Sequence, residues 1–510
     1  MQDAIFSTPL PEENLRDESG MTGYGDAIVF PRDTAQLQAV IKQVCTDRRI
    51  LTVQGARTGI CGGAVPLGGS VVNLSAMTDI EGFFFDAQTN RAHVSLQAGV
   101  TLEHLNQRLL SKKLDTCCFD RKSLACWEAY RQSEVTLRFA PNPTETSATV
   151  GGMAAANAIG SHIYAGVDMR TQVLAVEVVM PNGIVACASR LEGESPPLPM
   201  DYFGNTVDLS VHPQCGNCAG YNTEGDLIDF ICGSEGTSGV ISRLTLALAP
   251  VPPSTCGLLA FFDTPAQMIL FLADMEQKAE QVADGRIVGA DFFEASCFRF
   301  IRRMRSSVSA LCALPDFSTG VSVSLWLEIA AQNEDVIFAL LEDSLECLKN
   351  VGAPADSALV ATDSREFSRL QGLRHGITEA ANLFSYEKKV FTMDINVPKY
   401  EYSALIARLS VEMRQHPFEC VLMGRAGTGH LSFRLMPETG AQQVLAEQVH
   451  RRWMRQFTDL RCECACEYGV GRLKRELFET LCPSRAAATK RIRSALDPAG
   501  LFSPGVLCDS

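Results

Sequence analysis

The sequence lacks long apolar runs, basic clusters and a recognisable export signal. None of its hydrophobic stretches reaches the roughly 20 consecutive apolar residues that a membrane-spanning helix needs, so we expect no membrane span. Residues 1–20 contain early acidic residues and no apolar core of signal-peptide length. We therefore expect a cytoplasmic protein, with peripheral attachment to the inner membrane through a partner left open.

Positive charge is scarce. The chain has 59 Asp and Glu residues against 45 Lys and Arg residues, which gives a formal net charge of −14 at pH 7. Because binding to a phosphate backbone needs a concentrated cationic surface, we expect no nucleic-acid partner. The length of 510 residues exceeds what one hydrophobic core supports, so two domains are expected.

Cysteine, in contrast, is abundant, with 19 residues. Without an export signal, we expect most of them to be reduced thiols that pack as small hydrophobic side chains. Two clusters are candidates for metal sites, "HPQCGNC" (212–218) and "CECAC" (462–466). Neither has the paired C-x-x-C spacing of zinc sites or the cysteine runs of iron–sulfur proteins. We expect no metal at either cluster, and their role stays open.

The pattern of apolar residues divides the chain near a Pro-rich joint at 249–257. Before the joint, an amphipathic helix with an Asp cap is predicted at 31–49, followed by short strands and helices interrupted by glycine. After it, long helical patterns alternate with strands such as 321–330 and 389–398. This predicts an α+β protein with one domain at 26–252 and another at 253–508.

A glycine-rich segment, "QGARTGICGG" (54–63), follows a predicted strand. Glycine permits positive φ and close backbone approach, so successive amides can converge on an anion such as a pyrophosphate. The spacing is neither that of a Rossmann fingerprint nor that of a P-loop. Taken alone, the segment is either a phosphate site or an ordinary turn.

Three such loops occur in order, at 54–69, 141–160 and 233–246. Together they resemble the PCMH-type FAD-binding domain of the vanillyl-alcohol oxidase superfamily, in the branch of D-lactate, glycolate and D-2-hydroxyglutarate dehydrogenases. The resemblance covers 27–250 and resumes at the C-terminus. It implies an α+β architecture: a two-subdomain FAD-binding domain, then a ferredoxin-like cap domain whose last segment returns to the flavin.

The resemblance also implies which residues hold FAD. Residues of the first loop would cradle the pyrophosphate, those of the second would run beside the ribityl chain and flavin ring, and those of the third would hold the adenine side. Relatives with a covalent flavin commonly have a His in the first loop, and here there is none, so we expect non-covalent FAD. The expected residues are Gly55, Arg57, Thr58, Gly59, Gly62, Gly63, Pro141, Thr144, Gly151, Gly152, Ala155, Asn157, Gly160, Glu235, Gly236, Gly239 and Val240.

The second half resembles the cap domain, but its metal motifs are altered. Metal-dependent members carry G-H-x-G-D-G-N-x-H and, later, E-H-G-x-G, which bind a divalent metal. Here these motifs read "GRAGTGHLS" (424–432) and "EYGVG" (467–471), so that only Glu467 survives among the ligands. The replacements are Arg425, Thr428, His430, Ser432 and Tyr468. We therefore expect no bound metal.

Other side chains would then handle the substrate. A guanidinium at Arg425 could restore positive charge and bidentate geometry for a carboxylate, and Arg374 matches an Arg that the family uses on the substrate carboxylate. Oxidation of an alcohol also needs a base, for which His430 is the first candidate and Glu467 and Tyr468 are alternatives. Structural roles stay open: an ion pair for Arg425, a core position for Tyr468 and a helix cap for Glu467.

The sequence thus predicts an FAD-dependent dehydrogenase acting on the CH–OH group of a small 2-hydroxy acid, such as D-lactate or glycolate. Electrons would pass to a separate acceptor, either an iron–sulfur partner or a quinone-linked chain. Two alternatives stay open. One is a non-catalytic flavin-binding subunit of an iron–sulfur-linked complex, suggested by the altered metal motif. The other is an oxidase of a different alcohol.

Overall fold

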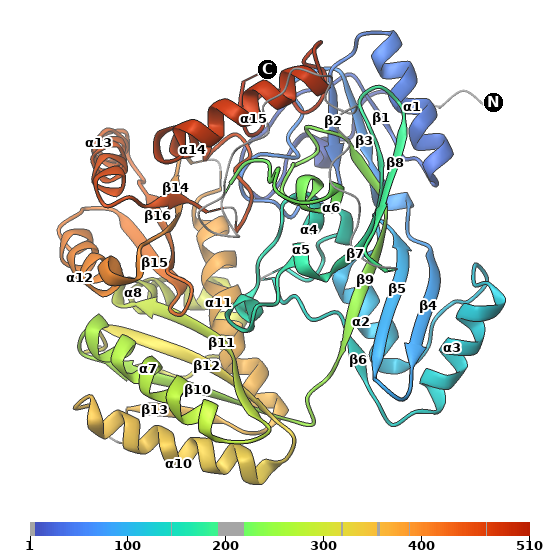
Figure 1. Cartoon of the computed structure of the whole chain (residues 1–510). Coiled ribbons are helices and arrows are strands. Elements are labelled where there is room, and N and C mark those ends of the chain that lie inside the picture. Colours follow the sequence, from blue (N-terminus) through green and yellow to red (C-terminus); the bar gives the residue numbers. More distant parts are fainter. Residues whose placement is uncertain are drawn as a thin grey trace. The chain divides into compact units, whose positions relative to one another are not determined.

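The protein is described by a computed structural model that divides into two compact units (Figure 1). Unit 1 comprises residues 1–160, 167–251 and 466–510, and unit 2 comprises residues 161–166 and 252–465. Both contain helices and sheets, so the predicted α+β class is confirmed. The structure describes residues 6–143, 145–191, 219–317, 320–353, 357–386, 388–465 and 467–509.

Unit 1 begins with a three-stranded parallel sheet in the order β1-β3-β2. Its strands are β1 (Ala27–Val29), β2 (Leu51–Gln54) and β3 (Ser70–Asn73). The helix α1 (Thr34–Thr46) precedes β2 and is capped by Asp33, whose carboxylate accepts the backbone N–H of Gln36 at 2.8 Å. The helix and cap expected within 31–49 are therefore confirmed.

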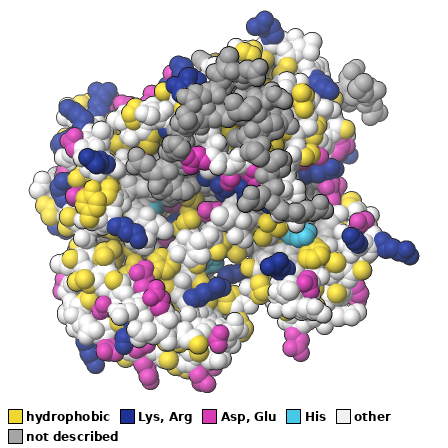
Figure 2. Space-filling model, viewed as in Figure 1, with side chains coloured by type: hydrophobic (Ala, Val, Ile, Leu, Met, Phe, Trp, Pro, Cys, Tyr) yellow, Lys and Arg dark blue, Asp and Glu magenta, His cyan; other side chains and the backbone are white. Residues whose placement is uncertain are grey.

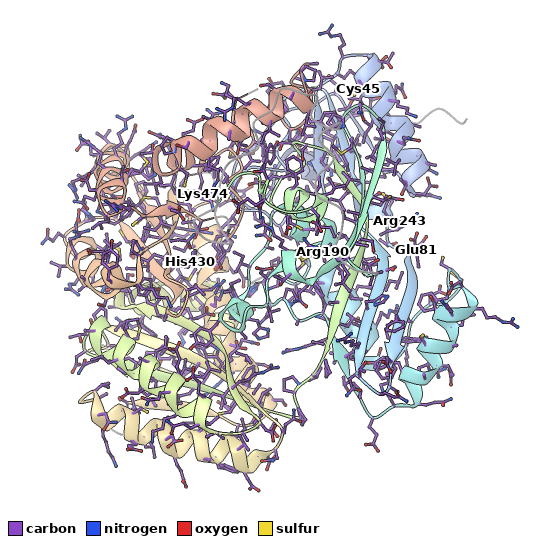
Figure 3. The ribbon with its side chains drawn as sticks, in the orientation of Figure 1. Cys45, Glu81, Arg190, Arg243, His430 and Lys474 are labelled. Atoms are coloured by element: carbon purple, nitrogen blue, oxygen red, sulfur yellow. The ribbon has the colours of Figure 1, made fainter. Side chains whose placement is uncertain are left out.

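The second sheet of unit 1 is antiparallel, in the order β4-β5-β9-β7-β8, and β6 also pairs with β9. Arg243 on β9 lies 2.9 Å from Glu81 on β4 (Figure 3). It also lies 3.6 Å from Glu177 on β7. The strands are β4 (Ile80–Asp86), β5 (Arg91–Gln97), β6 (Leu137–Arg138), β7 (Val173–Val179), β8 (Val185–Ser189) and β9 (Val240–Pro250).

Besides α1, the described part of unit 1 contains one short helix before the first strand and others between and after the strands. They are η1 (Glu12–Leu15), η2 (Leu74–Ala76), α2 (Leu102–Ser111), α3 (Arg121–Gln132), α4 (Val150–Ala155), α5 (Met169–Gln172), α6 (Leu227–Ile231), α14 (Arg475–Leu481) and α15 (Pro483–Leu496). The C-terminal segment joins the first sheet, because the N–H of Leu51 donates to the carbonyl of Leu501 and the N–H of Ser503 donates to the carbonyl of Leu51.

Unit 2 is built on an eight-stranded antiparallel sheet in the order β13-β10-β12-β11-β15-β16-β14-β17. Its strands are β10 (Ser254–Phe262), β11 (Gly285–Glu294), β12 (Val323–Ala331), β13 (Ala358–Ala361), β14 (Phe391–Asn396), β15 (Glu419–Arg425), β16 (His430–Met436) and β17 (Glu463–Cys464). Its helices are η3 (Ser161–Ala165), α7 (Pro265–Gln281), α8 (Ala295–Met304), η5 (Arg305–Ser307), α9 (Ser309–Cys312), α10 (Glu334–Asn350), α11 (Ser364–Phe384), η6 (Lys399–Glu401), α12 (Tyr402–Met413) and α13 (Gly440–Asp459).

The two faces of this sheet differ in chemistry, because successive side chains of a strand point to opposite sides. One face packs Phe292 against Tyr402 of α12 and Phe433 against Trp453 of α13. On the other face, Trp326 and its apolar neighbours form a buried cluster with α8 and α11. That second face also carries a row of buried polar side chains, which the strand register brings together.

The surface carries charges of both signs. On the face shown in Figure 2, Lys and Arg side chains of the described residues are interspersed with Asp and Glu and with single hydrophobic side chains. Within the described part of the chain, no helix combines the length and apolarity that crossing a membrane requires. The described cysteines are free thiols, and most are buried; the cluster at 212–218 lies outside the described residues.

Candidate functional site

The buried side-chain amide of Gln54 stabilises the first glycine loop of unit 1 through hydrogen bonds. Its Nε2 donates to the carbonyls of Asn14 and Ala64, both at 2.8 Å, and its Oε1 accepts from Asn14 Nδ2 at 2.9 Å. Among the hydrogen bonds of the described residues, none is donated by a backbone N–H of residues 55–59. This loop is partly exposed, so its amides can receive an anion.

Close contacts explain one glycine in the first loop and one in the second. A Cβ at Gly55 would lie 2.3 Å from Thr149 Oγ1, and the same hydroxyl accepts the N–H of Gly152 at 3.2 Å. A Cβ at Gly151 would lie 2.6 Å from the Cβ of Ala98. Larger side chains cannot occupy either position without moving their neighbours. Of the other expected first-loop residues, Gly59 is exposed, while Arg57, Thr58, Gly62 and Gly63 flank it in the same loop.

The second and third loops meet through the backbone. The N–H of Glu235 donates to the carbonyl of Ala155 at 2.8 Å, and Asn157, at the end of the second loop, is buried. Pro141 is also buried, and Gly160 lies against the backbone of Asn142. Thr144 lies outside the described residues. Gly236, Gly239 and Val240 lead from Glu235 into β9.

Glu235 has a role that sequence reasoning did not predict. Its carboxylate accepts the N–H of Val470 at 2.6 Å and the N–H of Gly471 at 2.8 Å. Burial raises the pKa of this carboxyl, and the two backbone donors partly oppose that effect. The Glu235 side chain therefore anchors the C-terminal segment of unit 1, which places the glycines of "EYGVG" beside the third loop.

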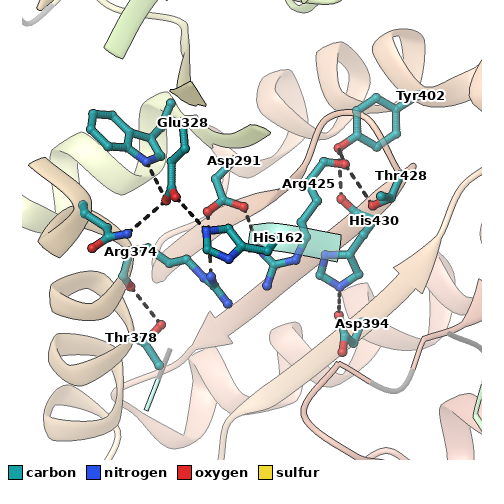
Figure 4. Close-up of polar contacts among 12 residues, drawn as sticks. His162, Asp291, Glu328, Arg374, Thr378, Asp394, Tyr402, Arg425, Thr428 and His430 are labelled. Atoms are coloured by element: carbon teal, nitrogen blue, oxygen red, sulfur yellow. Dashed lines mark hydrogen bonds and ion pairs between the residues drawn. The ribbon is translucent and has the colours of Figure 1, made fainter. Parts of the chain in front are cut away.

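In unit 2, the buried polar face contains both arginines expected at the substrate site. Arg425, at the end of β15, is the register partner of Asp291 on β11 and of His430 on β16. Its Nη1 lies 2.6 Å from Asp291 Oδ1, and Arg374 Nη1 on α11 lies 3.8 Å from Asp291 Oδ2 (Figure 4). Asp291 thus holds two guanidinium groups, one with each carboxylate oxygen.

The third expected residue on this face, His430, contacts a buried carboxylate. Its Nε2 pairs with Oδ1 of Asp394 on the neighbouring strand β14 (Figure 4). Both side chains are almost fully buried. From the opposite face, the hydroxyl of Tyr402 donates to the carbonyls of Arg425 at 3.1 Å and His430 at 2.9 Å, which fixes both strands next to the hairpin turn.

A second buried His–carboxylate pair lies on the same face. His162 Nε2, from η3, is 3.0 Å from Oε2 of Glu328 on β12, and Gln371 and Trp326 donate to Oε1. Burial alone would raise the pKa of Glu328, but the hydrogen bond and charge of His162, together with the other donors, lower it to about 2. Glu328 is therefore ionised at neutral pH and fixes the imidazole of His162.

The other two candidates for the base belong to unit 1. Glu467 is buried, and Tyr468 is partly buried with the ammonium of Lys474 at 5.8 Å from its ring centroid. Lys474, which Figure 3 labels, is itself fully buried. The structure thus places His430, Arg425 and Arg374 together in unit 2 and Glu467 and Tyr468 in unit 1.

Sequence reasoning missed the acidic partners and His162. Asp291 and Glu328 are single carboxylates inside apolar strands, "GADFF" and "LWLEIA", and a buried charge in such a strand needs a partner. That signal could have identified both residues. Asp394 stands out in the sequence only as part of "MDINVP", and His162 only as part of the segment after the second glycine loop.

Comparisons with known proteins agree with these features. Residues 251–507 match the family described as "FAD linked oxidases, C-terminal domain", and residues 25–119 match "FAD binding domain". The chain is 24% identical over 519 residues to a D-lactate dehydrogenase of Anaerostipes hadrus, covering 99% of this chain and 94% of that protein. It is 22% identical over 490 residues to the glycolate oxidase subunit GlcD of Bacillus subtilis, covering 94% and 88%.

Two further similarities are to another hydroxy-acid dehydrogenase and to a solved structure. The mitochondrial D-2-hydroxyglutarate dehydrogenase of Rattus norvegicus is 23% identical over 487 residues, covering 94% of this chain and 78% of that protein. A solved structure of alkyldihydroxyacetonephosphate synthase has a TM-score of 0.57 at 11% identity, over 95% of this chain and 76% of that one, and so shares its fold. With the open amides of the first loop and its close packing on the second, these matches make FAD the cofactor.

Proposed function

This chain belongs to the FAD-linked oxidases, and from that premise we propose that it oxidises a small 2-hydroxy acid such as D-lactate or glycolate. Electrons would leave through a separate acceptor, an iron–sulfur partner or a quinone-linked chain. The names of the similar proteins support the substrate class. The main observation behind the proposal is the buried polar face of unit 2. Its arginines could bind the substrate carboxylate, and its His–Asp pair could accept the proton of the substrate hydroxyl.

Recognition of the substrate carboxylate is assigned to Arg425 and Arg374. Both guanidinium groups face Asp291, so their orientation is fixed before substrate arrives. A guanidinium offers two parallel N–H donors to a carboxylate and keeps its charge at every working pH. Asp291 acts as a positioning residue, because it holds the arginines without contacting the substrate.

Removal of the hydroxyl proton is assigned to His430. Asp394 engages Nε2, so the imidazole is held in one orientation and the charge that it acquires on protonation is stabilised. We assign Nδ1, the opposite ring nitrogen, as the proton acceptor. When bound, FAD supplies the chemistry of accepting a hydride from the substrate α-carbon. Glu467 and Tyr468 remain the alternative bases in this proposal.

We further propose non-covalent FAD and a reaction that needs no divalent metal. The first metal motif now carries a guanidinium, Arg425, in an ion pair with Asp291, and hydroxyls at Thr428 and Ser432. A guanidinium cannot ligate a cation and repels it. The two motifs still contain one imidazole, His430, and one carboxylate, Glu467, and Asp394 pairs with His430 from the neighbouring strand. Metal-dependent activity would make these three residues the first ligands to test.

The decisive experiment is anaerobic absorbance of the bound flavin, before and after addition of D- and L-2-hydroxy acids, with and without a chelator. The proposal expects bleaching by one acid that is unaffected by the chelator. Bleaching that the chelator abolishes would refute the metal-free site. A flavin that no hydroxy acid bleaches would refute the proposed function and favour a non-catalytic subunit or an enzyme for another alcohol.

A further inference from the structure

Two neighbouring cysteines in unit 1, Cys117 and Cys118, present their thiols side by side at the surface. Both are free and exposed, and their sulfur atoms are 3.6 Å apart. Their segment connects α2 to α3, away from the three glycine loops in sequence. Nothing in the proposed oxidation uses them.

The backbone holds this pair in a defined turn. The N–H of Phe119 donates to the carbonyl of Thr116 at 3.0 Å, which places both cysteines at the two central positions. Asp115 Oδ1 accepts the N–H of Cys117 at 3.0 Å, and the Phe119 side chain is buried. The turn is therefore anchored on both sides of the exposed thiols.

We propose that Cys117 and Cys118 form a bidentate dithiol site for a thiophilic metal or metalloid ion, such as trivalent arsenic. Thiolates are the soft ligands that such ions select. With metal–sulfur bonds of about 2.3 Å, sulfurs at the observed separation subtend an angle of about 103° at the ion, close to tetrahedral. The ion can bind both sulfurs without rearrangement of the turn.

A disulfide fits this pair less well. Neighbouring Cα atoms across a trans peptide are about 3.8 Å apart, below the range of roughly 4.4–6.8 Å that disulfides normally span. The sulfurs would also have to close to about 2.05 Å. A bridging ion relieves both constraints, because it adds one atom to the ring.

Binding must displace the thiol protons. The hydrogen bond with Cys118, and then Asp115, raises the pKa of Cys117 to about 11, so this thiol is protonated at neutral pH. With a monosubstituted arsenical R–As=O, two S–H groups react to give R–As(S)2 and one water. Two As–S bonds replace the As=O bond, arsenic stays trivalent, and no oxidant is needed.

The test uses phenylarsine oxide and the full chain carrying Cys215→Ser and Cys218→Ser, because that C-x-x-C segment could also chelate arsenic. Protection of each cysteine from iodoacetamide is measured by peptide mass spectrometry. We expect joint protection of Cys117 and Cys118 at one arsenical per site. The exposed single thiols Cys187 and Cys312 should stay reactive and serve as internal controls.

Single variants decide whether the two thiols act together. In Cys117→Ser or Cys118→Ser, the arsenical concentration needed to protect the remaining thiol should rise at least about 100-fold, because the second bond is lost. Both positions are exposed, so folding should be unaffected, which the thermal midpoint checks. Unchanged protection in either single variant, or protection of Cys312 equal to that of the pair, would overturn the site.

Discussion

Arg425 Nη1 lies 2.6 Å from Asp291 Oδ1, and the two residues are register partners on neighbouring strands of the eight-stranded sheet. Both side chains are at most 5% exposed. A buried pair of this kind contributes little net stability but fixes the direction of its guanidinium. Removal of either partner destabilises the fold, because it leaves the other charge buried without compensation. The pair therefore orients a cation on the face that the proposed function requires.

Arg425→Lys keeps the charge at this position but loses the planar pair of donors. We expect the KM for the hydroxy acid that bleaches the flavin to rise about 10- to 100-fold, the equivalent of one charged hydrogen bond, with a smaller change in kcat. Steady-state kinetics provide the measurement. Arg303→Lys is the matched control, because Arg303 makes exposed ion pairs with Glu419 and Glu438 in the same unit. An unchanged KM in Arg425→Lys would remove this residue from the substrate site.

His430→Gln removes the proposed base. The rate of anaerobic flavin bleaching at saturating substrate should fall about 10²- to 10⁴-fold, which is the usual contribution of a general base. Asp394→Asn should lower the same rate and also move its pH dependence, because the imidazolium loses its buried counter-charge. His375→Gln, at a half-exposed position on α11, is the control. If His430→Gln bleaches at the normal rate, Glu467 and Tyr468 become the bases to test.

Gly55→Ala should reduce the amount of FAD that copurifies with the protein. Its Cβ would lie 2.3 Å from Thr149 Oγ1 and would push the first loop away from the second. Gly440→Ala, at the start of α13 and outside the three glycine loops, is the control, because a Cβ there meets nothing within 4 Å. The ratio of flavin to protein, measured by absorbance, should fall in the first variant alone. Equal loss in both would show that steric contact with Thr149 is not the cause.

Asp17, beside the first loop, should make stability depend on pH. Burial raises its pKa from 3.8 to about 6, partly offset by its hydrogen bonds. The folded carboxyl thus binds its proton more tightly than the unfolded one, so the free energy of unfolding falls as pH rises from about 4 to 6. The cost above pH 6 is up to about 3 kcal/mol.

Asp17→Asn should accordingly raise the thermal midpoint at pH 7.5 by several degrees and leave it nearly unchanged at pH 4. The amide oxygen can still accept from Ser19, so that contact is kept. Glu18→Gln, one residue further along at an exposed position, is the control and should change neither value. A midpoint that drops at pH 7.5 would mean that ionised Asp17 stabilises the fold through Arg472.

The sequence was sufficient to predict the fold class and the cofactor. The three glycine loops require backbone geometry that few residues other than glycine can adopt, so they can be recognised from the sequence alone. The pairing of Arg425 with Asp291 could not be predicted from the sequence, because the two residues are far apart in the chain and meet only through strand register. The same holds for His162 with Glu328 and for Glu235 with Val470, where the partner of a charge is set by the tertiary fold.

The contacts of the C-terminal segment also constrain how the protein is made. Glu235 binds the N–H groups of Val470 and Gly471, and Leu51 exchanges hydrogen bonds with Leu501 and Ser503. A ribosome must therefore synthesise all of residues 252–465 before unit 1 receives its last segment. During translation, the first two parts of unit 1 are complete before the hydrogen-bond partners of Leu51 and Glu235 in the C-terminal segment have been made. A messenger truncated before codon 466 encodes all of unit 2 but only an incomplete unit 1.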